Sequence, residues 1–270
     1  MELNERYYAR FGLEYNPFVK NNSTKHYYES SDLKEAKYKL DYLFKTKGIG
    51  VITGNPGMGK TTTIRKYLNE LNRALYKPIY ICMTTLNDND FYRQLIKELG
   101  YEPKFRKCDN FRLVQQIIKE FENKKITPVI VIDEANYLSR TILNDLKMIL
   151  NFNMDSFDNY ILILMGLPVL VSNLQGAAHE PFRQRIITSY NLEGLTNDET
   201  REYIYSKLEK AGGSTNIFDE GVVKAICNSS SNTPRIIDRT MDYALLIADK
   251  LNSSIITKEV IQKAIEQTIL

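Results

Sequence analysis

The sequence predicts an α/β fold in which a parallel sheet is flanked by helices and is followed by a small domain made only of helices. Three observations predict it. Short apolar runs alternate with amphipathic stretches up to about residue 195, which is typical of βαβ units. Two of these runs, 128–132 and 160–165, are apolar almost throughout, as expected of strands buried on both faces. Beyond residue 195, only helical periodicity remains.

The composition is that of a globular protein. Apolar residues make up 43% of the 270 residues and charged residues 26%, which excludes the disordered and fibrous classes. The longest apolar run, 160–171, is shorter than the about 20 residues that a membrane span needs, and the N-terminus has no signal-peptide pattern. The three cysteines lie far apart and there are only two histidines, so we expect no zinc site. We therefore expect a cytoplasmic protein with no membrane segment.

The first predicted element is a helix. Asp32 and Glu35 have the spacing of a capping box, and the helical pattern runs to Phe44. A strand-like run at 49–53 leads into a Gly-rich turn, and a helix follows over about 60–75. The same alternation predicts the rest of the sheet region: strands at 78–84, 128–132, 160–165 and, at the sheet edge, 186–192, with helices at 88–99, 111–123 and 141–151.

A second capping-box pattern, Thr196 with Glu199, begins the all-helical part of the chain. That helix is expected to end at the glycine pair 212–213, because glycine favours the left-handed conformation that closes many helices. Three further helical patterns follow, over 218–228, 234–251 and 258–269.

A phosphate-binding motif lies between the first strand and the next helix. The residues that fit G-x-x-x-x-G-K-[ST] are Gly54, Asn55, Pro56, Gly57, Met58, Gly59, Lys60 and Thr61, and Thr62 follows them. Glycines let backbone N–H groups curl around phosphates, and the helix N-terminus adds the positive end of its dipole. Lys60 would neutralise the β- and γ-phosphates, and Thr61 would place its hydroxyl on Mg²⁺. A purely structural Gly-rich turn is disfavoured, because spacing and context agree.

Two carboxylates complete the predicted nucleotide site. Asp133 and Glu134 directly follow the apolar strand 128–132, so they lie at the carboxyl edge of the sheet, where ligands bind in open α/β folds. Asp133 would hold Mg²⁺ through water, and Glu134 would act as a base on the attacking water. The alternative is an acidic pair at a helix N-terminus. The spacing of roughly 70 residues from the phosphate loop favours a catalytic role for this pair. We therefore predict an ATPase that uses ATP and Mg²⁺.

With these two motifs the chain resembles the P-loop ATPases, and the helical region after the core narrows the resemblance to AAA+ proteins. The resemblance implies three segments: residues 1–47, which pack on the nucleotide site, a P-loop core at 48–195 and a helical lid at 196–270. It also implies that Arg235 contacts the nucleotide from the lid, where Thr233 caps the helix and Pro234 suits its first turn. An arginine on a solvated helix start is the alternative.

AAA+ proteins also carry an arginine finger before the last core strand, supplied to the neighbouring subunit's γ-phosphate. Arg185 fits that position best and Arg183 is second, while a surface ion-pair network is the alternative. An arginine finger that acts on the neighbouring subunit implies a homo-oligomer, whether a ring, a spiral or a filament.

The sequence departs from the AAA+ pattern at the polar residue that usually ends the fourth strand. Here Leu167 stands there and cannot orient water, so either Ser172 or Asn173 takes the role or hydrolysis is slow.

The N-terminal segment makes the resemblance closer. The pattern Tyr8-x-x-Phe11-Gly12-Leu13-x-x-Asn16-Pro17-Phe18, the run Tyr27-Tyr28-Glu29-Ser30 and the lid sequence 194–212 are similar to those of ExeA/GspA-type ATPases. By this resemblance adenine rests near Tyr27 and Tyr28. The same module occurs in secretion or cell-envelope ATPases and in transposition helpers of the TnsC, TniB and Mu B type.

The sequence favours the transposition helpers. The secretion-type proteins continue past the ATPase module into a transmembrane helix, and this sequence shows no such helix up to Leu270. The resemblance then implies double-stranded DNA, a DDE-type transposase and a target-selection protein as partners. A truncated secretion-type module, or another initiator-like AAA+ ATPase, is the alternative.

DNA contact would need basic side chains facing a pore. Lys104, Arg106 and Lys107 lie between the second and third core strands, the usual insertion region of initiator-type AAA+ proteins, with Arg112 nearby. Further basic residues follow at Lys119, Lys124 and Lys125. Such residues would contact phosphates and give affinity without sequence readout. An ordinary solvated loop is the alternative. The net charge of +3 is too small for tight binding by a monomer, so DNA binding should depend on assembly.

Overall fold

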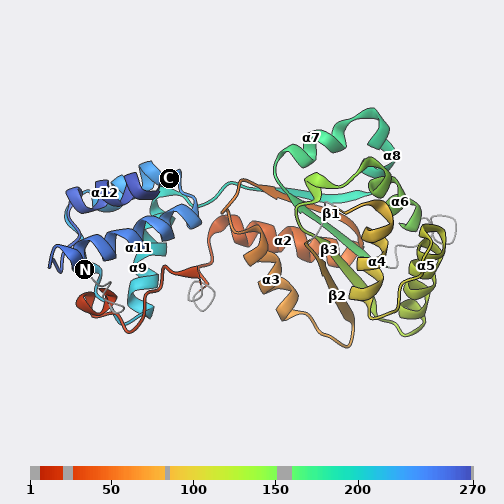
Figure 1. Ribbon diagram of the computed structural model, residues 1–270, viewed down its shortest axis with the longest axis horizontal. Helices are drawn as coiled ribbons and strands as arrows, with labels where there is room; N and C mark the ends of the chain where they lie inside the picture. Colours follow the sequence, from red (N-terminus) through yellow and green to blue (C-terminus); the bar gives the residue numbers. More distant parts are fainter. Residues whose placement is uncertain (1–6, 21–26, 83–85, 151–159, 269–270) are drawn as a thin grey trace. The chain divides into compact units, whose positions relative to one another are not determined.

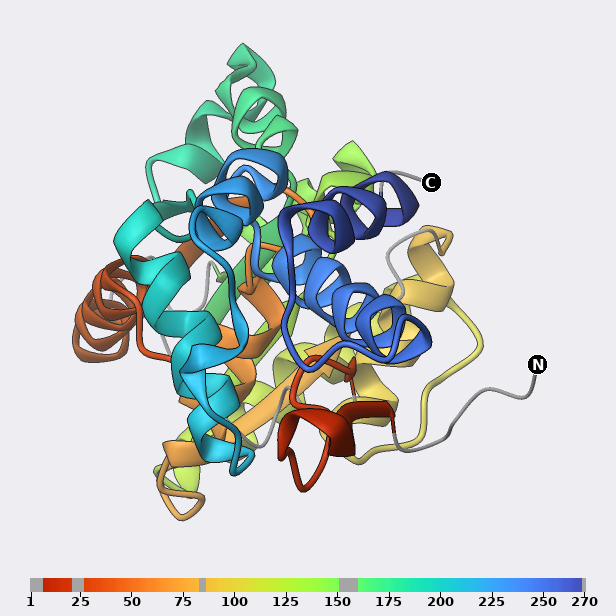
Figure 2. The same ribbon diagram turned by 90° about the vertical axis from the view of Figure 1, so that its left-hand side faces the viewer.

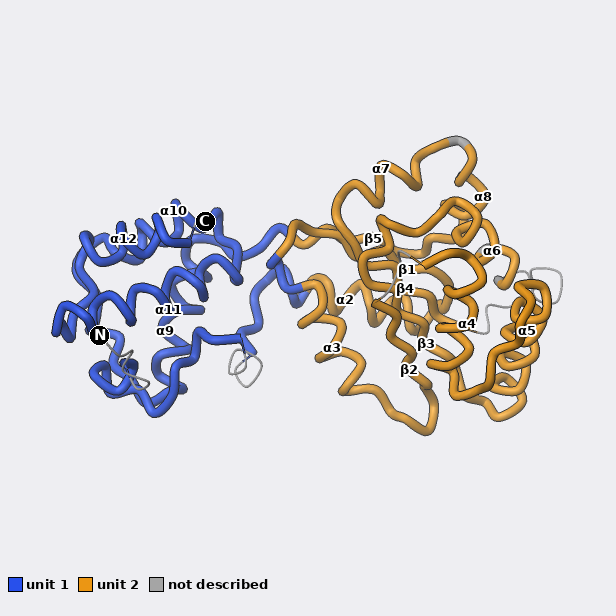
Figure 3. Tube along the Cα trace, viewed as in Figure 1, with its two compact units in different colours: residues 1–34, 57–59, 193–270 blue, residues 35–56, 60–192 orange. Residues whose placement is uncertain are grey.

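The computed structural model describes residues 7–20, 27–82, 86–150 and 160–268 (Figure 1). They form two compact units, which Figure 3 distinguishes by colour. The sheet unit comprises residues 35–56 and 60–192, and the helical unit comprises residues 1–34, 57–59 and 193–270. The tip of the phosphate loop, 57–59, thus groups with the helical unit, although the strand and helix on either side of it belong to the sheet unit.

The sheet unit contains the predicted parallel sheet. Its strands are β1 (Gly48–Gly54), β2 (Tyr76–Ile81), β3 (Thr127–Ile132), β4 (Ile161–Gly166) and β5 (Ile186–Leu192). All pairings are parallel and the order is β2-β3-β4-β1-β5, so β5 is an edge strand as expected. Strands β1, β3 and β4 end at the same carboxyl edge, which brings the phosphate loop and the Asp133–Glu134 pair to one side of the sheet.

Helices cover both faces of the sheet (Figure 1). On one face, alternate strand residues such as Ile49, Ile130 and Leu162 share a core with α4 (Asp88–Leu99), α5 (Lys107–Asn123) and α6 (Arg140–Leu150). The other face carries α2 (Ser31–Thr46) and α3 (Lys60–Glu70). A Cβ added to Gly50 would lie 2.5 Å from the Leu43 side chain of α2, so this helix packs directly on β1. Two short helices, α7 (Val169–Gln175) and α8 (Glu180–Arg183), lead to β5.

Several predicted boundaries were wrong, each for a local reason. Helix α5 begins at Lys107 rather than at residue 111, and the preceding loop is closed by the buried Asn110, whose side chain bonds to both backbone groups of Lys104. Helix α3 ends at residue 70 rather than 75, because Asn72 forms a turn in which its side-chain oxygen accepts from the Ala74 amide at 2.9 Å and its carbonyl accepts from the Tyr76 amide at 3.0 Å. The predicted end of β2 at residue 84 and the end of the 141–151 helix lie outside the described residues.

The expected capping box at Asp32 was also wrong. Ser30 caps α2 instead, because its Oγ accepts a hydrogen bond of 3.2 Å from the Leu33 amide. The buried Asp32 carboxylate accepts from the amides of Glu193 and Gly194, both at 3.1 Å. Asp32 therefore ties the start of α2 to the segment that leads into the helical part of the chain.

The helical unit is built on α9 (Asn197–Lys210), α10 (Val222–Ser230), α11 (Pro234–Lys250) and α12 (Lys258–Thr268). The predicted capping box of α9 is confirmed by both of its hydrogen bonds, between Thr196 and Glu199. The N-terminal 3-10 helix η1 (Tyr7–Phe11) lies beside α11 (Figure 2), where Tyr7 donates to Asp242 and Arg10 Nε donates to Asp249 at 2.7 Å.

Helix α10 begins four residues later than predicted. Phe218 is extended and forms an isolated parallel bridge with Ile256, and Gly221 precedes the helix in a left-handed conformation with φ of 81°. Two backbone hydrogen bonds make this bridge: the Ile256 amide donates to Ile217 at 2.7 Å, and the Asp219 amide donates to Ile256 at 3.1 Å. The bridge joins the segments before α10 and before α12.

Candidate nucleotide site

The phosphate loop connects β1 to α3 in a conformation that requires glycine. Gly57 and Gly59 have φ of 88° and 93°, in the left-handed region that side chains disfavour. A Cβ at Gly57 would also lie 2.8 Å from Arg235 Cβ and 3.0 Å from Thr233 Cγ2. Backbone N–H groups of such a loop, together with the N-terminus of α3, form a site for phosphate.

Lys60, the first residue of α3, is turned back toward the loop. Its side chain is buried, and Nζ donates to the carbonyl oxygens of Gly54 at 2.7 Å and Asn55 at 3.2 Å. A buried ammonium group is expensive unless it is hydrogen-bonded, so these carbonyls hold the cation beneath the loop. The lysine is thereby positioned beside the proposed phosphate cradle.

Thr61 and Asp133 meet at the carboxyl edge of the sheet. Thr61 Oγ1 donates to Asp133 Oδ2 at 3.1 Å, and the amide of Glu134 donates to Asp133 Oδ1 at 2.9 Å. A hydroxyl and a carboxylate oxygen are hard ligands, and Mg²⁺ is commonly held by one or two such groups together with phosphates. The donor set therefore fits Mg²⁺.

Tyr80 is a member of this cluster that the sequence did not reveal. It lies on β2, next to β3, and its hydroxyl donates to Asp133 Oδ2. Burial and then the Asp133 carboxylate raise the pKa of Tyr80 above its ordinary value, so the phenol stays protonated and remains a donor. A tyrosine in a strand ordinarily indicates packing, which is why the pattern gave no signal.

Glu134 directly follows Asp133 and is exposed. Its backbone has φ of 53° and ψ of 36°, a left-handed conformation that is uncommon for a residue other than glycine. Such strain is found most often at functional sites. It turns the chain sharply between β3 and the 3-10 helix η2 (Ala135–Tyr137), and so sets the direction of the Glu134 side chain.

The two arginines before β5 have different surroundings. Arg183 ends α8, and its guanidinium donates to the carbonyl oxygens of Leu174 at 3.3 Å and Gln175 at 2.8 Å. It therefore closes the C-terminal end of α7. Arg185 is half-buried and immediately precedes β5. The structure thus gives the Arg183 guanidinium a local role in closing α7.

The residues predicted to contact nucleotide from the lid lie in the helical unit. Arg235 is exposed in the first turn of α11, close to Gly57. Pro234 is the first residue of that helix as expected, but the Thr233 side chain makes no capping hydrogen bond. Tyr28 donates to Glu202 at 2.7 Å and packs edge-on against Tyr203.

The end of β4 has no polar side chain of its own. Leu167 is half-buried there, and Ser172 and Asn173 are exposed on α7. Instead, Oδ1 of Asn136, from η2, accepts a hydrogen bond of 3.0 Å from the Leu167 amide. This hydrogen bond could not be predicted from the sequence, because Asn136 and Leu167 are 31 positions apart.

The predicted basic cluster is only partly exposed. Lys104 and Arg106 are exposed, and between them Phe105 is 86% exposed. Lys107 begins α5 and forms ion pairs with Asp145 at 2.6 Å and Asp88 at 3.4 Å. Although desolvation opposes it, the two carboxylates raise the pKa of Lys107 above its ordinary value.

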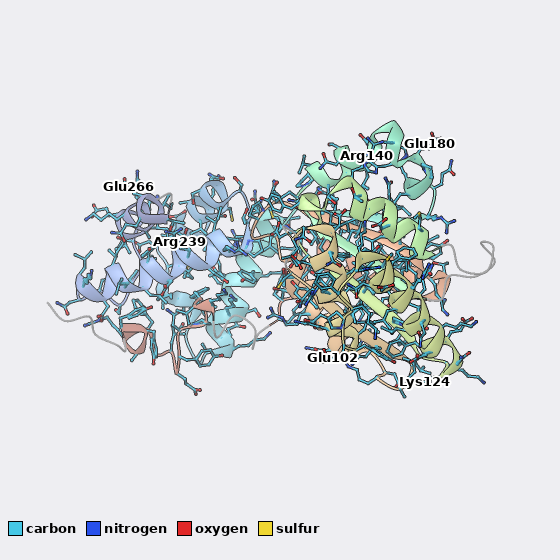
Figure 4. All side chains as sticks on the ribbon, turned by 45° about the vertical axis from the view of Figure 1, so that its right-hand side comes forward. Glu102, Lys124, Arg140, Glu180, Arg239 and Glu266 are labelled. Carbon is cyan, nitrogen blue, oxygen red and sulfur yellow. The ribbon has the colours of Figure 1, made fainter. Side chains whose placement is uncertain are left out.

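The other basic residues of this region are spread along α5, and Lys124 and Lys125 lie beyond its far end. That helix has 17 residues, so it is about 25 Å long. Lys124 follows its last turn and points away from the sheet (Figure 4), near the start of β3. Lys104 and Arg106 lie instead beside the start of α4, where Asn89 donates to the Phe105 carbonyl at 3.1 Å. They therefore share the carboxyl edge of the sheet with the phosphate loop.

Comparisons with known proteins agree with this architecture. Residues 42–174 match a family model described as an AAA domain. General secretion pathway protein A of Aeromonas hydrophila is 27% identical over 243 residues, which is 88% of this chain and 44% of that protein. The ATP-dependent target DNA activator B of Escherichia phage Mu is 26% identical over 149 residues, or 55% of this chain and 44% of that protein. The chain thus spans less than half the length of both relatives.

A solved structure shows the same fold. Cdc6p from Pyrobaculum aerophilum superimposes with a TM-score of 0.67 and 15% identity, over 93% of this chain and 71% of that one. Among the described residues, the helices are too short or too polar to cross a membrane.

Proposed function

We propose that this chain, which belongs to the AAA+ P-loop ATPases, binds and hydrolyses ATP and uses the nucleotide to assemble on double-stranded DNA as a regulator of transposition. The observation that carries the ATPase part is the meeting of Lys60, Thr61, Asp133 and Glu134 at the carboxyl edge of the sheet. The DNA part rests on the exposed Lys104 and Arg106 at that same edge.

In the proposed reaction, the amides of the phosphate loop and the Lys60 ammonium bind the β- and γ-phosphates. Mg²⁺, held by Thr61 and Asp133, would neutralise charge on these phosphates. Glu134 accepts the proton of the attacking water, which is a role that an exposed carboxylate at this edge can perform. Arg185 acts on the ATP of a neighbouring subunit, so that hydrolysis depends on assembly.

The proposed DNA interface consists of Lys104 and Arg106. Both are exposed, whereas Lys107 is neutralised by Asp88 and Asp145 and has less charge to offer a phosphate. Two cations per subunit are too few for tight binding by a monomer. A homo-oligomer repeats them along the duplex and multiplies the contacts. Activator B of phage Mu, whose name describes an ATP-dependent target DNA activator, supports this proposal by its similarity. A DDE-type transposase and a target-selection protein would then be partners in a cytoplasmic complex.

A second candidate function is that of a secretion or cell-envelope ATPase module. The observation that favours it is the match to general secretion pathway protein A, which covers 88% of this chain. Both candidates share the ATPase site, so only the partner distinguishes them. Another initiator-like remodelling ATPase would also use this site.

DNA binding is the experiment that separates the candidates. Fluorescence anisotropy with a labelled duplex of random sequence is measured at low salt with and without a non-hydrolysable ATP analogue. We expect binding only with the analogue and a steep loss of affinity as salt rises, because each phosphate neutralised releases counterions. The double variant Lys104→Glu/Arg106→Glu should weaken binding to all sequences alike and reduce the slope of log affinity against log salt.

The matched control is Lys124→Glu/Lys125→Glu, which removes equal charge at the opposite end of α5. It should leave most of the affinity intact, whereas a merely electrostatic effect of net charge would weaken both variants alike. Lys107→Glu should lower the stability of the fold, because it puts a third carboxylate beside Asp88 and Asp145. An absence of DNA binding in every nucleotide state would favour the secretion candidate.

A further inference from the structure

The carboxamide of Asn136 lies where β3 and β4 end side by side. Asn136 belongs to η2, which follows Glu134, and its Oδ1 accepts a hydrogen bond of 3.0 Å from the amide of Leu167. An added Cβ at Gly166 would lie 2.5 Å from that oxygen, so only glycine at the end of β4 allows this approach. The carboxamide is thus fixed to β4, although it comes from the segment after β3.

The hydrogen bond also fixes which end of the amide faces the strand. A backbone N–H can only donate, so the side-chain oxygen must face Leu167, and Nδ2 points the other way. Among the described residues no protein acceptor receives the Nδ2 protons, and Asn136 is half-buried. Two oriented donors therefore remain at the carboxyl edge, two residues from Glu134.

These donors lie where β4 lacks a polar side chain. The Leu167 side chain cannot hydrogen-bond, and its amide is used by Asn136. Ser172 and Asn173 lie further on in α7, where both side chains are exposed. Asn136 is the polar group that the fold presents at this point.

We propose that Asn136 Nδ2 donates a hydrogen bond to an oxygen of the terminal phosphate of ATP, and so supplies the polar contact that β4 itself lacks. The proposal rests on the proposed ATP binding. In the hydrolysis that it assists, the water oxygen bonds to the γ-phosphorus and a water proton passes to Glu134. The bond from the γ-phosphorus to the bridging oxygen breaks, and its electron pair leaves with ADP. The amide stabilises charge on the phosphate oxygens during this step.

Asn136→Asp is the sharpest test. Aspartate has nearly the same shape and keeps an oxygen for the Leu167 amide, but it loses both donors and adds a negative charge. We measure equilibrium dissociation constants for a non-hydrolysable ATP analogue and for ADP, together with the thermal unfolding midpoint. The analogue should bind about tenfold more weakly, since a hydrogen bond to a charged group is lost. ADP has no terminal phosphate, so its affinity should change less than twofold. Turnover should fall about 10²-fold, as for loss of one donor to a developing charge.

Two further variants make the result interpretable. Asn136→Ala introduces no negative charge, although it leaves the Leu167 amide without its acceptor. It should show the same selective loss of affinity for the ATP analogue. Asn144→Ala, which changes an exposed asparagine of α6, should behave as the wild type. Equal changes in the affinities for the ATP analogue and for ADP, or no change in either affinity, would contradict the proposed role of Asn136. If the wild-type protein bound neither nucleotide, the ATPase proposal itself would fail, which is a distinct outcome.

Discussion

Thr61 and Asp133, which are 72 residues apart in the sequence, are joined by a hydrogen bond of 3.1 Å between Oγ1 and Oδ2. The bond connects the start of α3 to the end of β3, across the carboxyl edge of the sheet. It brings together the two residues proposed to hold Mg²⁺, so these two side chains are already adjacent in the fold.

Replacing Lys60 with alanine should abolish measurable ATP binding. The buried ammonium is the cation at the phosphate loop, and without it the loop's amides face the charge of the phosphates alone. Isothermal titration calorimetry with an ATP analogue should show a loss of at least about 10²-fold in affinity, the effect of removing a buried charged partner. Arg65→Ala, an exposed change on the same helix, is the control and should bind normally. Unchanged affinity in Lys60→Ala would refute the site.

Replacing Glu134 with glutamine should preserve ATP binding and stop turnover. The amide is nearly isosteric but cannot accept the proton of the attacking water, so the rate should fall by about 10²- to 10⁴-fold. Release of phosphate and the dissociation constant are measured on the same preparation. Glu102→Gln, an exposed carboxylate elsewhere in the sheet unit, should hydrolyse ATP at the wild-type rate. Normal turnover by Glu134→Gln would assign the base to another residue.

Replacing Arg185 with alanine should abolish hydrolysis while a subunit still binds ATP. An arginine finger contributes about 10³-fold or more to the rate in related chemistry. Arg183→Ala should instead mainly lower stability, since its guanidinium is bonded to the carbonyls of Leu174 and Gln175. The reverse result, with turnover lost only in Arg183→Ala, would exchange the two roles.

Mixing the Arg185→Ala and Glu134→Gln proteins tests whether the arginine acts between subunits. Each variant lacks a different half of a shared site, so some mixed interfaces would contain one intact site and regain activity. The specific activity is measured as a function of mixing ratio, with each variant alone as the control. A mixture that stays as inactive as its components would indicate that both residues act within one subunit.

Replacing Glu199 with glutamine should lower the free energy of unfolding in a pH-dependent way. Its two carboxylate oxygens accept from the amides of Ser31 at 2.6 Å and Thr196 at 2.9 Å. Desolvation alone would raise the pKa of Glu199, but these amides outweigh it and lower the pKa below 4.5. A glutamine has one acceptor oxygen, so one amide loses its partner, and we expect a loss of about 1 kcal/mol at pH 7.

The sign of the pH dependence follows from the lowered pKa. The contribution of the Glu199 charge is complete above the pKa of the unfolded chain and is lost as the pH falls through the pKa of the folded one. Urea unfolding should therefore separate wild type and variant at pH 7, and the difference should shrink as the pH falls through the lowered pKa of Glu199. Glu209→Gln, exposed on the same helix, should show little difference at either pH. A constant difference over the whole range would contradict the charge argument.

Sequence patterns correctly predicted the elements whose structure depends on residues close together in the chain. Strands β3 and β4 are apolar runs, and the loop from Gly54 to Lys60 follows from its own spacing, so these elements could be found in the sequence. The Thr196–Glu199 cap is likewise a local pattern and is present. In contrast, the same pattern at Asp32 was misleading, because its carboxylate is used by amides 161 and 162 residues away.

The contacts that shape the site escaped prediction for the same reason. Tyr80 and Asn136 act through hydrogen bonds to Asp133 and Leu167, which depend on the order of the strands in the sheet. The separation of Lys104 from Lys124 depends on the direction of α5, which the sequence pattern could not give. Side-chain roles that arise from neighbouring strands thus become visible only in three dimensions.

The bridge between Phe218 and Ile256 has a consequence for hydrogen exchange. The Ile256 amide is hydrogen-bonded to Ile217, and the residue is completely buried although it belongs to no helix. Amides in connecting segments usually exchange by local fluctuation, but this one must wait until the segments before α10 and α12 separate. Its exchange rate would therefore report the opening of the helical unit as a whole, from a single position that lies outside the fraying ends of helices.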